Sequence, residues 1–392
     1  MTSKGADMTL KFGTFMAPFH CPVGQDPTAA YERDLDVIKH MDKLGFDEAW
    51  IGEHHSCGHE LIPDPFMFIT YAAPQTRHIK LGTGVVSLPY HNPLWVADRA
   101  LFADRLLRGR FMLGLGPGAL PTDATMIGIG PEEQRTALEE DVDVLMALLR
   151  GETVNAKTNR YNLVDARTQY EPYSDFDVAV AAIASPTGPR TAAKNGIDLL
   201  SVGATAKGGF DALALHWDVM EERAPQFGHT PSRAGWRLCG PMHLAETREQ
   251  AIEDVRYGLD AWCDYTQHVL AAPHFRAAGT TFEERVEWVN ESGLGVIGTV
   301  DDAIAQIERL VKQSGGFGSY LLIHHEWARH EATMKSYELF ANHVKPRFQR
   351  ATGRLEAARD YGISRWDELD KRSGAAIQEA TDRHAKERVA AS

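Results

Sequence analysis

Short apolar segments alternate with amphipathic ones over most of the chain, and this alternation constrains the fold more than any other feature of the sequence. Eight short segments are rich in β-branched and apolar residues and read as strands, starting at residues 10, 48, 79, 110, 177, 197, 236 and 319. Apolar residues recur at helical spacing in the segments between them, at 28–44, 64–77, 94–108, 132–150, 189–195, 209–224, 301–313 and 331–344. Eight strand–helix units predict a (β/α)8 TIM barrel.

A doubly wound α/β sheet is the rival architecture. It would have fewer strands and usually a glycine-rich turn after the first strand, whereas residues 17–22 here read APFHCP. The long segment 246–290 reads as an insertion with helical stretches between strands seven and eight, and 151–176 as polar and irregular. We expect the barrel to span 1–350 and the charged, alanine-rich segment 351–392 to form a tail that is helical or partly disordered.

The composition excludes several classes of partner. The chain has 392 residues, of which 43% are hydrophobic, enough for a large core. Its formal net charge of -13 argues against a nucleic-acid partner and against an anionic membrane. The four cysteines form no C-x-x-C pair, and no apolar run approaches the length of a membrane span. These features predict a cytoplasmic protein without disulfides.

Polar and aromatic side chains collect where the predicted strands end. The stretch 48–56 (EAWIGEHHS) starts as a strand and ends in Glu53, His54 and His55. In a parallel barrel this is the end where chemistry takes place. The paired acids that a glycosidase needs are missing. Six histidines at or near predicted strand ends could bind a metal: His54, His55, His59, His91, His324 and His325. Barrel metallohydrolases carry an H-x-H on the first strand, which this chain lacks, so we predict no metal site.

Two further motifs each allow two interpretations. Residues 184–188 (ASPTG) offer hydroxyls and amides at a helix N-terminus, which is either a phosphate site or an ordinary helix cap. Gly82-Thr83-Gly84 interrupts a strand with glycine, either because a planar cofactor ring approaches the backbone or because a neighbouring side chain packs against it.

Several stretches taken together resemble the bacterial luciferase-like flavin monooxygenases. They are KFGTFM, GFDEAWIGEHH, IKLGTGVVSLP, NPLWVADRALFADRLLRGR and GRFMLGLGPG, and GFDEAWIGEHH and GTGVVSLPYHNP are most similar to the limonene 1,2-monooxygenase type. The resemblance covers roughly residues 10–348. It implies a barrel that binds FMN, supplied in reduced form by a separate flavin reductase, with O2 as co-substrate. It also implies insertion of one oxygen into a small apolar organic molecule, such as a monoterpene or cyclic ketone, by epoxidation, hydroxylation or Baeyer–Villiger oxidation.

The resemblance also assigns site residues. His54 and Glu53 match the family's catalytic pair, and an imidazole there can move a proton if its pKa lies near the working pH. Gly84 and Val85 match a pair joined by a cis peptide under the flavin ring. The implied cofactor-binding residues are Glu53, Thr83, Gly84, Val85, Ser185, Thr187 and Arg190. Relatives carry a phosphate-binding Arg where this chain has Pro117, and Arg190 is the proposed substitute.

The remaining assignments concern the substrate pocket and assembly. Aromatic and imidazole side chains near the strand ends are expected to line the pocket, and the 246–290 insertion to act as its lid; these side chains are Phe15, Phe19, Tyr90, His91 and Trp95. The broad apolar face of helix 94–108 predicts a homodimer or higher homo-oligomer; it includes Leu94, Val96, Leu101, Phe102 and Leu106. Three alternatives stay open: a deazaflavin (F420) hydride-transfer enzyme on the same fold, a non-catalytic flavin-binding protein, and the disfavoured metallohydrolase.

Overall fold

The computed structural model describes residues 9–17, 19–21, 25–183, 185–206, 212–270, 275–349 and 351–391. Eight parallel strands close into a barrel, in the order β1 (Lys11–Met16), β2 (Glu48–Ile51), β3 (Lys80–Thr83), β5 (Phe111–Gly116), β8 (Val178–Ala182), β9 (Asp198–Val202), β10 (Trp236–Leu244) and β12 (Ser319–Ile323). The ring is complete because β12 pairs with β1, and β10 pairs with both β9 and β12. The predicted (β/α)8 barrel is confirmed.

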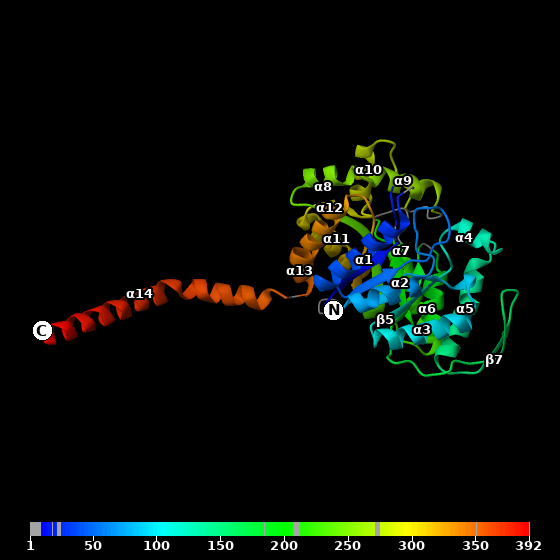
Figure 1. Cartoon of the computed structure of the whole chain (residues 1–392), viewed down its shortest axis with the longest axis horizontal. Coiled ribbons are helices and arrows are strands. Elements are labelled where there is room, and N and C mark those ends of the chain that lie inside the picture. Colours follow the sequence, from blue (N-terminus) through cyan, green and yellow to red (C-terminus); the bar gives the residue numbers. More distant parts are fainter. Residues whose placement is uncertain are drawn as a thin grey trace. The chain divides into compact units, whose positions relative to one another are not determined.

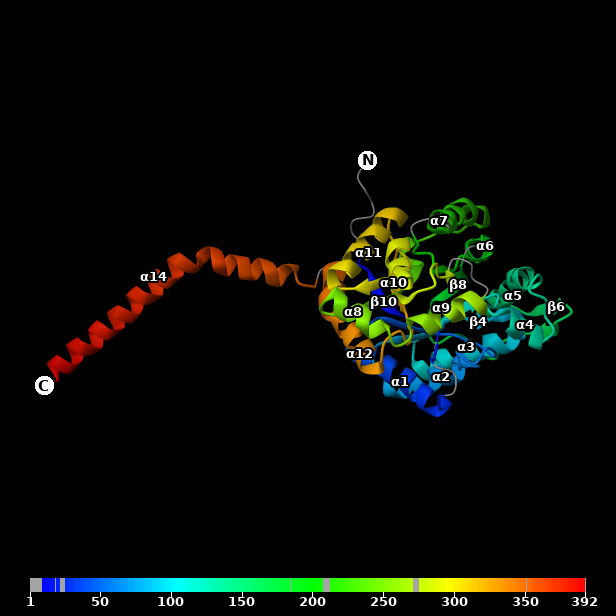
Figure 2. The same ribbon diagram turned by 90° about the horizontal axis from the view of Figure 1, so that it is seen from above.

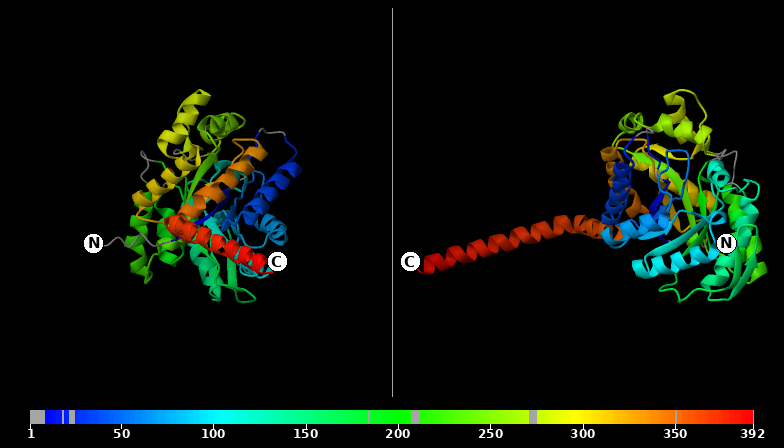
Figure 3. Two further views of the ribbon diagram at one scale, coloured as in Figure 1. Left: turned by 90° about the vertical axis from the view of Figure 1, so that its left-hand side faces the viewer. Right: turned by 45° about the vertical axis from the view of Figure 1, so that its right-hand side comes forward.

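Helices surround the strands (Figures 1 and 3). Each of the eight predicted helical segments contains one: α1 (Pro27–Lys43), α2 (Pro65–Ala72), α3 (Pro93–Leu107), α5 (Gln134–Leu149), α6 (Thr187–Asn195), α7 (Ala212–Arg223), α11 (Val300–Ser314) and α12 (His330–Leu339). The first of them illustrates the local rules. The Asp26 carboxylate accepts a hydrogen bond from the Thr28 amide at 3.0 Å, and the apolar stripe of Leu35, Ile38 and Met41 is buried against the barrel.

Three regions differ from the expectation. The segment 151–176 is only partly irregular, because β6 (Val154–Lys157) and β7 (Asn162–Ala166) form an antiparallel hairpin there. A short helix, α4 (Pro121–Met126), follows β5. The third predicted strand is broken after Thr83, and β4 (Val86–Ser87) resumes on β5. The predicted insertion holds the expected helical stretches as α8 (Arg248–Val255), α9 (Leu259–His268) and α10 (Phe282–Ser292), and β11 (Val296–Gly298) then pairs with β10.

Trp50 fills the barrel interior and explains a glycine of the third strand. A Cβ atom on Gly82 would lie 3.1 Å from Trp50 Cε3, and one on Gly114 would lie 3.1 Å from Trp50 Cζ3. The Arg237 guanidinium lies 4.9 Å from the centroid of this ring and is ion-paired with Glu48 at 2.8 Å. Of the two explanations for Gly82, packing against a neighbouring side chain is the one that has contacts in the structure.

Residues 1–345 and 346–392 form two separate compact units. The insertion helices α8, α9 and α10 of the first unit lie together at one end of the barrel (Figures 1 and 2). The second unit is mainly α14 (Gly353–Ala390), in which no residue is buried; α13 (Lys345–Gln349) precedes it. None of the helices in the described ranges combines the length and the apolarity needed to cross a bilayer.

Candidate active site

A cavity of about 480 Å3 opens where the strands of the barrel end. Its volume lies in the usual range for small-molecule sites. Residues that follow β2, β5 and β8 supply its polar groups, while side chains of α9 and the segment after it cover it. The residues used below are Phe15, Glu53, His54, Glu60, Gly84, Val85, Gln134, Arg135, Ser185, Thr187, Trp262, Tyr265, Leu270 and Phe275.

Glu53 is the most constrained carboxylate of the cavity. It is 2% exposed, and its Oε1 accepts hydrogen bonds from His91 Nε2 at 2.8 Å and from His55 Nε2 at 2.9 Å. Its Oε2 accepts one from the Ser87 amide at 2.9 Å. Burial alone would raise the pKa of Glu53, but the two imidazoles and the amide outweigh it and lower that pKa to about 2. Glu53 is therefore a fixed anion, and the same hydrogen bond raises the pKa of His55.

His54 lies between two other carboxylates. Its Nε2 is 2.6 Å from Glu60 Oε2, and its Nδ1 is 3.4 Å from Asp123 Oδ2 of α4. The His54 amide donates to the Ile62 carbonyl at 3.0 Å, which fixes the backbone. Burial would lower the pKa of His54, but Glu60 and Asp123 overcome it and raise that pKa to about 10.

This pKa corrects the expectation of a histidine that exchanges its proton near neutral pH. A group with a pKa of about 10 stays protonated over the physiological range. His54 is thus a fixed positive charge facing the cavity. Glu60 and Asp123 were not recognised from the sequence. Glu60 follows the Glu-His-His stretch on irregular chain, and Asp123 lies 68 residues after His55 on a short helix, so no periodicity marks either residue.

The far side of the cavity is suited to an anion. Ser185 precedes α6 and Thr187 begins it, both line the cavity, and no side chain caps this helix N-terminus. Free amides at a helix N-terminus favour anionic ligands such as phosphate. Arg135, in the first turn of α5, also lines the cavity, and within the described ranges no ion pair occupies it. A basic residue in a first helical turn opposes the helix dipole, and that was the signal in the sequence that could have identified Arg135.

The backbone between β3 and β4 forms another wall. Gly84 and Val85 both line the cavity, and the peptide bond between them is cis, as the resemblance implied. Thr83, just before them, is fully buried and faces away, since its hydroxyl donates to the Gly114 carbonyl at 2.8 Å.

Three of the five predicted pocket residues lie behind the lining and one outside it. Phe15 lines the cavity. Phe19 stacks on His59 and is 1% exposed, His91 is bonded to Glu53 as above, and the Tyr90 hydroxyl accepts from Gln134 Nε2 at 2.9 Å. Trp95 is 62% exposed on the outer surface of α3, so it does not belong to this cavity.

Arg190 is also away from the cavity. Its Nε lies 3.7 Å from Glu139, its side chain is half exposed, and it lines a different surface depression between α5 and α6. Of these two arginines, Arg135 lines the cavity and Arg190 does not. Pro117 also lines the cavity.

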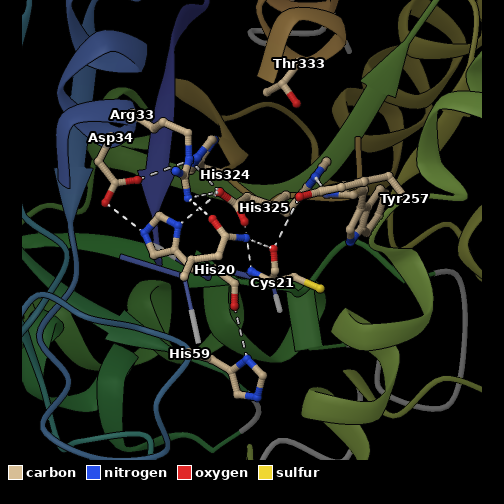
Figure 4. Close-up of polar contacts among 12 residues, drawn as sticks. His20, Cys21, Arg33, Asp34, His59, Tyr257, His324, His325 and Thr333 are labelled. Atoms are coloured by element: carbon tan, nitrogen blue, oxygen red, sulfur yellow. Dashed lines mark hydrogen bonds and ion pairs between the residues drawn. The ribbon is translucent and has the colours of Figure 1, made fainter. Parts of the chain in front are cut away.

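A second histidine cluster lies outside the cavity, between α1 and the segment after β12 (Figure 4). His20 Nε2 is 3.1 Å from Asp34, and His20 Nδ1 is 3.1 Å from Glu326, which also pairs with Arg33. His324 Nδ1 is 2.8 Å from the Tyr337 hydroxyl. Within the described ranges, no group of three or more His, Cys, Asp or Glu side chains is arranged to hold a metal ion.

Comparison with known proteins agrees with this geometry. The family model for luciferase-like monooxygenases matches residues 10–316. The chain is 45% identical to limonene 1,2-monooxygenase of Rhodococcus erythropolis, over 97% of this chain and 96% of that protein. It is 39% identical to 4-hydroxyprotoasukamycin monooxygenase of Streptomyces nodosus subsp. asukaensis, over 86% and 92%.

A solved structure is similar as a whole. The oxygenating constituent of 3,6-diketocamphane monooxygenase from Pseudomonas putida, a type II Baeyer–Villiger monooxygenase in complex with FMN, superposes with a TM-score of 0.70 at 23% identity, covering 86% of this chain and 99% of that one. The chain belongs to the luciferase-like monooxygenase family. The predictions of a luciferase-like barrel and of a flavin-dependent monooxygenase are therefore confirmed.

Proposed function

We propose that the cavity binds reduced FMN and a small apolar organic molecule side by side, and that the enzyme inserts one oxygen atom of O2 into that molecule. The observation that carries this proposal is the combination, in one cavity, of anion-binding groups, two separately held charges at His54 and Glu53, and apolar side chains. Reduced FMN supplies the electrons that activate O2. A separate flavin reductase is the expected source of the reduced cofactor.

The residues fit FMN in shape and charge. Ser185, Thr187 and the uncapped N-terminus of α6 provide neutral donors for the phosphate, and Arg135 provides the charge that Pro117 cannot. Gly84 and Val85 present backbone without long side chains, against which a flat ring can lie. Glu53 and His54 then border the ring from the end of β2.

The apolar cover supports an apolar substrate. Trp262, Leu270 and Phe275 line the cavity from α9 and the chain after it. Excluding water from this space strengthens the electrostatic effect of His54 and protects an activated oxygen from hydrolysis. The similarity to limonene 1,2-monooxygenase supports a monoterpene, and the likeness to a Baeyer–Villiger enzyme keeps a cyclic ketone as the second candidate.

The test is oxygen insertion with purified components. The purified chain, FMN, NADH and a flavin reductase should convert limonene to an oxygenated product at the expense of O2. The same mixture with a cyclic ketone tests the second substrate class. Consumption of substrate with reduced F420 in the absence of FMN and O2 would contradict the proposal.

We also propose a homodimer through the outer face of α2 and α3. Five large apolar side chains are exposed on these neighbouring helices: Met67, Tyr71, Trp95, Phe102 and Leu106. Two of the residues first assigned to this face, Val96 and Leu101, are instead buried in the barrel. A monomeric mass by light scattering at micromolar concentration would contradict the dimer, and Phe102→Asp in a chain that lacks 351–392 should produce such a monomer.

Two further expectations belong to the same proposal. The four cysteines are all free, which supports the cytoplasm as location. The division of the chain into two compact units supports assigning catalysis to residues 1–350 and a separate role to 351–392. Removal of 351–392 should leave kcat unchanged.

A further inference from the structure

Helix α14 carries an apolar stripe that nothing within its own unit covers. Leu355, Trp366, Leu369 and Ile377 follow one another at intervals of eleven, three and eight residues, which are close to whole turns of an α-helix. All four are exposed, Trp366 to 65%. Small residues lie on the same face, at Gly362 and Ser373 between them and at Ala380 after Ile377.

A helix of this kind is not expected to persist alone. It has 38 residues, no buried side chain and glycines at 362 and 374, each of which weakens a helix interior by about 1 kcal/mol. Isolated helices in water are marginal, and packing of an apolar face supplies most helical stability in proteins. The stripe therefore needs an occupant.

The charges beside the stripe indicate what the occupant is. One flank is mainly acidic, with Glu356, Asp367 and Asp370 against Arg359 and Arg388. The opposite flank is mainly basic, with Arg354, Arg365, Arg372 and Arg383 against Glu379. Two copies of this helix placed parallel, stripe against stripe, bring the acidic flank of each against the basic flank of the other. In an antiparallel pair each flank would meet its own kind.

We propose that α14 is an interaction surface for α14 of a second copy of the chain, and that the two helices pair parallel and in register through Leu355, Trp366, Leu369 and Ile377. Within one copy, Glu368 is 3.1 Å from Arg365 and 3.4 Å from Arg372. Exposed pairs of this kind are worth little, so the two arginines can exchange this partner for the acidic flank of the other copy.

The comparisons indicate that the tail is separate from the barrel's chemistry. The match to limonene 1,2-monooxygenase covers 97% of the chain and so must extend into α14. The match to the solved diketocamphane enzyme includes 99% of that enzyme but only 86% of this chain. The barrel fold is thus found without a segment the length of this tail, as expected if the tail serves association.

The experiment uses the full chain with one added cysteine. Ser373 lies at the centre of the stripe and Lys371 on the opposite side of the helix. In a parallel pair the two copies of residue 373 adjoin; in an antiparallel pair centred on Trp366 they would be about 21 Å apart, at 1.5 Å per residue. Each variant is oxidised at low protein concentration and its covalent dimer is measured on a non-reducing gel.

The expected result is a covalent dimer for Ser373→Cys at least about tenfold more abundant than for Lys371→Cys, with the unmodified chain giving none, because cysteine bridges need Cα atoms within about 7 Å. Adding Trp366→Asp and Leu369→Asp to Ser373→Cys should abolish the bridge without changing oxygen insertion. Equal bridging at 371 and 373, or none at 373, would overturn the proposal. Neither result bears on the α2–α3 dimer or on catalysis.

Discussion

Two clusters of histidine and carboxylate lie near strand ends of the same barrel, and they differ in what they face. In the cavity, His54 lies between Glu60 and Asp123 and borders open space lined by apolar side chains. In the other cluster, His20 lies between Asp34 and Glu326 and is itself 2% exposed, between α1 and the segment after β12 (Figure 4). Both histidines have raised pKa values, about 10 and about 9. A charged histidine at a strand end is therefore not in itself a catalytic group. It can take part in catalysis only if a ligand can reach it.

Replacing the two histidines should separate these roles most strongly. His54→Ala removes the positive charge beside the proposed flavin site, so we expect product formation to fall by about 10²–10³, the usual cost of losing one electrostatic contact to a reacting centre. FMN binding and O2 consumption should persist, with hydrogen peroxide replacing product. His20→Ala removes an equally buried charge and should cost stability without releasing peroxide. A His54→Ala variant with the product yield of the unmodified chain would contradict the catalytic role of His54.

The arginines of the two regions offer a second, smaller contrast. Arg135 faces the cavity without an ion pair in the described structure, whereas Arg33 is held by Glu326. A hydrogen bond to a charged group is worth about 1.5–3 kcal/mol, so Arg135→Ala should weaken FMN binding about 10- to 100-fold. Arg33→Ala and Arg190→Ala are matched controls and should leave the Kd unchanged. An equal loss of FMN affinity in all three variants would mean that binding depends on the total charge of the chain and not on the position of Arg135.

The contribution of the His20 cluster to the free energy of unfolding should depend on pH. The raised pKa of His20 means that its contribution to stability is complete below the unfolded value of about 6.5 and is lost as pH rises through about 9. We expect His20→Asn to lower the free energy of unfolding by about 1–3 kcal/mol at pH 6 and by clearly less at pH 9.5. Urea unfolding at both pH values measures this. A constant difference would show that packing, not charge, carries the effect.

The smallest effect is expected at His59, which lies between the two clusters. Its ring stacks on Phe19, and its Nδ1 is 3.2 Å from the His20 carbonyl. Because no carboxylate among the described residues pairs with it, His59→Ala should change product yield little and stability by no more than about 1 kcal/mol. A loss comparable to that of His54→Ala would show that the sequence analysis divided the histidines wrongly.

The sequence revealed the barrel more completely than the site. Strand and helix periodicity depends on local spacing, so all eight units were found from it, and Glu53 and His54 followed because they directly end a strand. Glu60, Asp123 and Arg135 escaped because their roles arise from contacts between segments far apart in the chain. Trp95 shows the converse error: an aromatic residue close to a strand end in sequence lies on the outer face of the helix that follows.

Arg135, which has no ion-pair partner among the described residues, also bears on how fast reduced FMN reaches the cavity. A chain with net charge -13 repels an anionic phosphate at long range, while Arg135 attracts it only over the last few ångströms. At physiological ionic strength the screening length is about 8 Å, so the repulsion fades and the local attraction remains; in dilute buffer, at about 30 Å, the repulsion reaches well into solution. Added salt should thus raise the association rate of reduced FMN and also raise its Kd. The rate of transfer from the reductase then depends on the ionic strength of the solution as well as on the two proteins.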